Sequence, residues 1–168
     1  ITKQHGVTEF VRYFYVENKI PFKLFIFGSG EDELSLADLI KEESLFGMVT
    51  YFGSKNAEEI KYFIKNFKGR FFGIAPYNKT FADHVYYGDS IKIKEYLSYG
   101  IPYITSEVSY LNPDIKKFGF VYSDYPALLD FFNKKIDSFT FDEENRIKVL
   151  KNYVWYHLLD NFLLKANI

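Results

Sequence analysis

A lysine and a glutamate stand three residues apart behind a serine in the segment SIKIKEYLSYG. The pattern predicts a helix that begins at Ser90, with Asp89 or Ser90 as its N-cap, and ends at Gly100. The first amides of a helix lack intrahelical partners, and the helix dipole places partial positive charge there. A cation such as Lys92 in the first turn opposes that dipole. An anion bound at this end would resolve the conflict, because Lys92 and the free amides would share it.

Glu95 lies one helical turn after Lys92, at i+3, and therefore on the same side of the helix. A carboxylate accepts hydrogen bonds from a vicinal diol such as that of a ribose. The two residues therefore fit a nucleotide, with phosphate at Lys92 and ribose at Glu95. They fit equally well a solvated ion pair on the helix surface, which would contribute only a few tenths of a kcal/mol. The spacing leaves both interpretations open.

Apolar runs and helical spacing alternate along the chain and must position this pair. They predict strands over 23–27, 47–53, 69–77, 101–106 and 119–123, and helices over 7–18, 31–44, 56–67, 90–99, 125–136 and 141–166. The helix over 31–44 is expected to be amphipathic and carries Leu34, Leu36, Leu39 and Ile40. Such alternation predicts an α/β fold, a Rossmann-like parallel sheet with helices on both faces. We expect residues 1–140 to form this domain and residues 141–168 to form a helical extension that packs on it.

Ligands of an open parallel sheet bind beyond the carboxyl ends of its strands, where helix N-termini point. Four segments should meet at that edge: Gly28–Gly30, Tyr51–Ser54, Ala75–Tyr77 and the loop over 78–90. The Gly-Ser-Gly turn lacks the third glycine of a dinucleotide fingerprint and is followed at once by acidic residues. It therefore favours a tight turn over direct phosphate binding.

The composition excludes several classes of function. The formal net charge of −1 argues against general affinity for nucleic acid, which needs a basic face. The chain has no cysteine, so it has no disulfide, thiolate zinc site or cysteine nucleophile. Its histidines, His5, His84 and His157, have no metal-binding spacing, and we expect no protein-bound metal. No apolar run is long enough to cross a bilayer.

The stretch GIAPYN…DSIKIKEYLSYGIPYITSE resembles the C-terminal, nucleotide-sugar-binding half of glycosyltransferases with the two-domain GT-B architecture. The resemblance is to the group 1, family 4-like members, and the APY…DSIK pattern has glucuronosyltransferase-like features. Many relatives carry a lysine, two variable residues, a glutamate and an aromatic residue, then a Gly-x-Pro turn into a strand. The matching residues here are Lys92, Glu95, Tyr96, Gly100 and Pro102. The similarity extends over residues 1–130.

The resemblance implies an enzyme that transfers a sugar from a nucleoside diphosphate sugar to a glycan or lipid-linked acceptor. It implies Lys92 and Glu95 as the catalytic residues and no resident cofactor. By this resemblance, Glu95 would bind the ribose, and Lys92 with the amides of Ser90 and Ile91 would hold the diphosphate. Tyr77 would line the nucleotide pocket, and the turn from Tyr51 to Gly53 would bracket the base. His5 stands where relatives often have a phosphate-binding lysine.

The resemblance also implies partners. An N-terminal acceptor domain of the same protein would supply the acceptor and any general base, so this chain alone should bind donor but transfer little or nothing. We expect a cytoplasmic location, with the inner face of the membrane as an option when the acceptor is lipid-linked.

Two other functions stay open on the sequence. A nucleotide-sugar epimerase of the same architecture would need carboxylates and a histidine facing the sugar, for which Asp83 and His84 are the loop candidates. A non-catalytic, flavodoxin-like interaction domain would bind no nucleotide.

Overall fold

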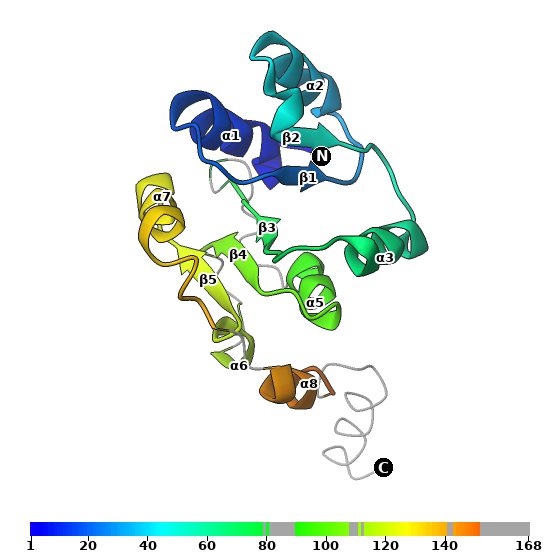
Figure 1. Ribbon diagram of the computed structural model, residues 1–168, viewed down its shortest axis with the longest axis vertical. Helices are drawn as coiled ribbons and strands as arrows, with labels where there is room; N and C mark the ends of the chain where they lie inside the picture. Colours follow the sequence, from blue (N-terminus) through cyan, green and yellow to red (C-terminus); the bar gives the residue numbers. More distant parts are fainter. Residues whose placement is uncertain (79, 81–89, 108–110, 112, 141–142, 152–168) are drawn as a thin grey trace.

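The computed structural model describes residues 1–78, 80, 90–107, 111, 113–140 and 143–151, and Figure 1 shows their arrangement. The chain is an α/β protein, as predicted, with parallel strands and helices in alternation. The described strands form two sheets. One pairs β1 (Leu24–Ile26) with β2 (Val49–Tyr51), and the other orders β3 (Gly73–Ala75), β4 (Tyr103–Ser106) and β5 (Gly119–Tyr122).

The two sheets are a departure from the single sheet that the sequence predicts. Every described pairing is parallel, with Phe25 opposite Thr50 in one sheet and Ile104 between Ile74 and Phe120 in the other. Within the described ranges, no hydrogen-bonded ladder joins β1 to β3. The strands are also shorter than the apolar runs that predicted them, since the ends of those runs form the connecting turns.

Helices cover both faces of the three-stranded sheet. Ile104 points into a large core with Leu128 and Phe131 of α7 (Tyr125–Lys134). Its neighbour Tyr103 points the opposite way, into a second core with α5 (Ile91–Ser98) and α6 (Pro113–Lys116). Successive residues of a strand face opposite sides, so β4 must be apolar along its whole length, and all four of its residues are buried.

The large core also fixes the N-terminal helices. Three N-terminal helices contribute to it: α1 (Val7–Val11), the π-helix η2 (Arg12–Glu17) and α2 (Glu33–Glu42). Their buried members are Phe10, Val11, Phe14, Tyr15, Leu36, Leu39 and Ile40. Leu34 of α2 does not join this core, since it is 74% exposed. Leu34 and Leu36 are two residues apart, about 200° around a helix, and cannot share one face.

Side-chain caps begin the helices where the sequence predicts. Asn56 caps α3 (Ala57–Asn66) through a capping box with Glu59, in which each side chain accepts from the other residue's amide at 2.9 Å. Gly100, with φ of 72°, follows the end of α5 in the left-handed region that favours glycine.

The C-terminal extension is described only in part. The structure shows α8 (Glu143–Lys151), and the rest of the helix predicted over 141–166 lies outside the described residues. The proposed division at residue 140 stays a prediction. In the part of the chain that was searched, no helix combines the length and the apolar character that crossing a membrane requires.

Candidate functional site

The N-terminus of α5 begins where β3 ends, and two side chains join the elements. Ser90 is the N-cap, with extended backbone angles, and its Oγ accepts a hydrogen bond from the amide of Ile93 at 3.4 Å. The same Oγ lies 2.7 Å from the hydroxyl of Tyr77, just after β3. The Ser90 hydroxyl is therefore held from two sides at the predicted anion-binding end of the helix.

Lys92 contacts a residue from the start of the chain. Its Nζ lies 3.1 Å from Nε2 of His5 and 5.4 Å from the centre of the Tyr77 ring. A lysine ammonium has only donors, so Nε2 of His5 accepts and Nδ1 carries the imidazole proton. Nδ1 of His5 lies 3.4 Å from Oγ1 of Thr2, so this proton faces the threonine hydroxyl. The lysine, the imidazole and the tyrosine ring form one polar cluster, which we call the Lys92 cluster.

Tyr77 is the buried member of the Lys92 cluster. The backbone carbonyl of Tyr77 accepts a hydrogen bond from the hydroxyl of Ser106 on β4 at 2.9 Å. Its ring centre lies 6.2 Å from that of His5, with the planes tilted by 56°. Burial raises the pKa of Tyr77, and the bond to Ser90 opposes that shift. The tyrosine is therefore a neutral, fixed hydroxyl at neutral pH.

A short N-terminal segment brings His5 to this place. The 3-10 helix η1 (Lys3–His5) ends at Gly6, whose φ is 60°. The amide of Asn78 donates to the carbonyl of Gln4 at 3.0 Å, so the segment is bound to the chain just after β3. A Cβ on Gly6 would lie 2.2 Å from the carbonyl oxygen of Pro76, so this close approach requires glycine.

The Lys92 cluster contains two basic side chains, those of Lys92 and His5, at a place where burial disfavours their charged forms. Burial lowers the pKa of Lys92, while the charge of Glu95 raises it and so opposes the shift. Burial, together with the positive charges of Lys92 and of the chain's amino group, lowers the pKa of His5 to about 4. An anion placed here would favour the charged forms of both groups.

Glu95 is exposed, one turn along α5. The structure does not show the ion pair between Lys92 and Glu95 that the spacing allowed. The side-chain ion pairs described in this structure join Lys55 with Glu59 and Lys134 with Asp130, and Lys92 points to His5 instead. Ile91, whose amide was a predicted phosphate ligand, has a side chain that is 72% exposed at the first position of α5.

The predicted base-binding turn lies at the carboxyl end of the other sheet. The hydroxyl of Tyr51 lies 3.0 Å from both the carbonyl oxygen of Gly28 and Oε2 of Glu33. The amide of Gly28 donates to the carbonyl of Gly53 at 2.8 Å. Tyr51 and Gly53 therefore fasten the Gly-Ser-Gly turn. No described contact joins them to Lys92, so the structure brings the predicted residues together in two groups.

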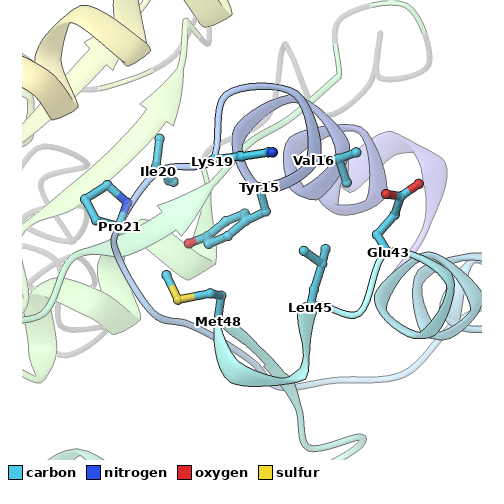
Figure 2. A pocket seen from close by; sticks show the side chains of 8 residues that line it. All are labelled: Tyr15, Val16, Lys19, Ile20, Pro21, Glu43, Leu45 and Met48. Carbon is cyan, nitrogen blue, oxygen red and sulfur yellow. The ribbon is translucent and has the colours of Figure 1, made fainter.

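One hollow among the described residues lies at neither group. It has a volume of about 500 Å³ and lies at the amino-terminal ends of β1 and β2, between Tyr15 and Lys19 on one side and Leu45 and Met48 on the other (Figure 2). Ligands of a parallel sheet bind at the opposite ends of the strands. This hollow is therefore no support for the predicted site.

A second hollow lies beside the predicted base-binding turn. It has a volume of about 540 Å³ and is lined by the rings of Phe27, Phe52, Tyr62 and Phe63 and by polar side chains at the start of α3. Phe27 and Phe52 stack with ring centres 4.9 Å apart and planes 6° apart. A flat apolar ring can stack on such a surface.

Several expected features lie outside what the structure tests. Asp83 and His84, the loop residues that an epimerase would need, are not among the described residues, and neither is His157. Among the residues that were searched, no group of three or more histidine, aspartate or glutamate side chains could hold a metal. The expectation of a metal-free site stays a prediction.

The contact between His5 and Lys92 is the feature that sequence reasoning did not find. The similarity placed His5 at a phosphate-binding position, but nothing in the local sequence pairs it with a lysine 87 residues away. Comparison with known proteins adds no assignment, because no family model matches this chain and no curated protein matches it.

Proposed function

We propose that this chain is the Rossmann-like donor half of a GT-B glycosyltransferase and binds a nucleoside diphosphate sugar. The observation that carries the proposal is the Lys92 cluster at the N-terminus of α5. Lys92 and His5 would contact the diphosphate together with the amides of Ser90 and Ile91, and exposed Glu95 would accept from the ribose hydroxyls. The sequence similarity described above supports the same assignment.

The chemistry expected of this site is the stabilisation of a leaving group. In glycosyl transfer, an acceptor hydroxyl attacks the anomeric carbon, and the bond from that carbon to the diphosphate oxygen breaks. The diphosphate leaves with the bonding electrons, and the acceptor proton goes to a base outside the described residues. Lys92 and the helix N-terminus would stabilise the charge that develops on the diphosphate.

A calorimetric titration tests the proposal. We would titrate the chain with UDP, GDP, ADP and CMP, and repeat each titration with Glu95→Ala. Binding of one diphosphate, weakened by the substitution, supports the donor site and names the base. Lys94→Ala is the control, since Lys94 lies on the same helix but two residues from Lys92 and therefore on another side. If no nucleotide binds, or if Glu95→Ala and Lys92→Ala both leave the affinity unchanged, the proposal is wrong.

A further inference from the structure

The hollow at the amino-terminal ends of β1 and β2 lies at the opposite ends of the strands from the proposed donor site. Its volume of about 500 Å³ is in the range of pockets that bind small molecules. The residues of the proposed donor site lie at the carboxyl ends of β2 and β3 and at the N-terminus of α5. A ligand in this hollow would therefore occupy a second site, apart from the first.

Part of the hollow is apolar. Figure 2 shows the ring of Tyr15 in the hollow, and the side chains of Leu45 and Met48 across the hollow from Val16. Tyr15 is buried and belongs to the large core, so its ring is held in place. The flexible thioether of Met48 can adapt to the shape of a bound group and contacts aromatic rings favourably. These side chains can contact an apolar group of a ligand.

Two exposed side chains of opposite charge line the same hollow. Lys19 and Glu43 lie on either side of Val16 in Figure 2. Among the described residues, neither of them forms an ion pair. Glu43 follows α2 directly, at the end where the helix dipole places partial negative charge, and its carboxylate is unfavourable there. A cation bound beside Glu43 would offset that repulsion, and an anion would pair with Lys19.

The backbone on both sides of the hollow has unusual conformations. Lys19 has a φ of 50°, and Ser44, which follows Glu43, has a φ of 55°. In the described part of the chain, these two are the only non-glycine residues in the left-handed region. Side chains disfavour that region, and residues held in it cluster at ligand sites. The helix before Lys19, η2, is a π-helix, which is also a frequent feature of functional sites.

We propose that this hollow binds an α-amino acid with an apolar side chain. The carboxylate of the ligand would pair with Lys19, and its ammonium with Glu43 and the C-terminus of α2. The ligand side chain would contact the apolar part of the hollow. Both charges belong at one end of the ligand, because Lys19 and Glu43 lie on either side of Val16 and the apolar side chains lie across from it. A ligand with a single charge would leave one of the two side chains unpaired.

A titration with L-phenylalanine, followed by NMR of the backbone amides, tests the proposal. We expect saturable binding with a dissociation constant of about 1 mM or lower, as so small a ligand allows. The amide shifts of Lys19, Glu43 and Met48 should change, and that of Ser90 should not. 3-Phenylpropionate lacks the ammonium, and phenethylamine lacks the carboxylate. Each should bind about tenfold more weakly than L-phenylalanine, because each loses one charged contact.

Two variants assign the charges. Lys19→Asn removes the ammonium, and asparagine tolerates the left-handed region, so the backbone conformation is kept. It should weaken L-phenylalanine and 3-phenylpropionate about tenfold and leave phenethylamine unchanged. Glu43→Gln should weaken L-phenylalanine and phenethylamine about tenfold and leave 3-phenylpropionate unchanged. Glu42→Gln is the matched control, because Glu42 is the neighbouring residue but does not line the hollow, and it should change none of the three affinities.

Three results would overturn the proposal. The first is a failure of L-phenylalanine to saturate the shifts by about 10 mM, or shift changes confined to other parts of the chain. The second is equal binding of L-phenylalanine and its two analogues to the unsubstituted chain, which would make the hollow a non-specific apolar surface. The third is displacement of L-phenylalanine by UDP, which would place the amino acid in the donor site, at the other ends of the strands.

Discussion

The Nζ of Lys92 and Nε2 of His5 lie 3.1 Å apart, although 87 residues separate them in the chain. The contact joins the first turn of α5 to the segment that precedes α1. Burial first, and then this contact, keep His5 neutral by lowering its pKa, because an imidazolium would be desolvated and would face an ammonium at hydrogen-bond distance. Much of what can be measured at this site follows from that one contact.

The ionisation of His5 should report the contact directly. We expect an NMR titration to give His5 a pKa of about 4, below its ordinary value of 6.5. Lys92→Met should raise that pKa, because it removes the neighbouring positive charge, but not to 6.5, because burial remains. A pKa near 6.5 in the unsubstituted chain would contradict the geometry. Lys94→Met is the matched control and should leave the pKa of His5 unchanged.

Diphosphate binding should be accompanied by proton uptake. His5 is neutral at pH 7 in the free chain, because its pKa lies well below 7. A bound anion favours the imidazolium and raises that pKa, so His5 takes up protons in the complex once the pH falls below the raised value, and affinity strengthens down to the free pKa of about 4. Calorimetry with UDP in two buffers of different ionisation enthalpy measures the uptake. His5→Gln should abolish it; uptake that persists in this variant would assign it to another group.

The Lys92 ammonium should contribute affinity through the phosphates alone. A hydrogen bond to a charged group contributes about 1.5–3 kcal/mol, so Lys92→Ala should weaken UDP binding by about ten- to a hundredfold. Uridine, which has no phosphate, should bind both forms of the chain equally. A substitution that weakens uridine and UDP alike would indicate a general loss of structure, which circular dichroism would detect.

The glycine before α1 should be intolerant of a side chain. Gly6→Ala forces a Cβ to within 2.2 Å of the Pro76 carbonyl at a φ of 60°. We expect a loss of about 1–3 kcal/mol in the free energy of unfolding, measured with urea. Gly47→Ala is the matched control, since a Cβ there has nothing within 4 Å and the φ of Gly47 is not in the left-handed region. Equal effects of the two substitutions would contradict the close approach.

The two faces of α5 should differ in their contribution to stability. Leu97 is fully buried, and Ile91 is 72% exposed. Leu97→Ala should cost about 2–5 kcal/mol in the free energy of unfolding, because it leaves a cavity in the core shared with Tyr103. Ile91→Ala should change it by less than about 0.5 kcal/mol. Thermal or urea unfolding distinguishes the two, and a large effect at Ile91 would mean that the helix is packed differently.

The local chemistry of the chain was readable from the sequence. Ser90, which was a predicted N-cap together with Asp89, caps α5, because a cap depends on residues within one turn. The apolar runs became parallel strands, since only strands covered on both sides bury such runs.

The tertiary structure alone decided which groups meet. It placed His5 against Lys92, bonded Tyr77 to Ser90, and left Glu95 on the surface. It also divided the described strands into two sheets. The sequence determines helices and strands because their hydrogen bonds and periodicity are local. It does not by itself reveal contacts between residues far apart in the chain, because those depend on how the helices and strands pack together.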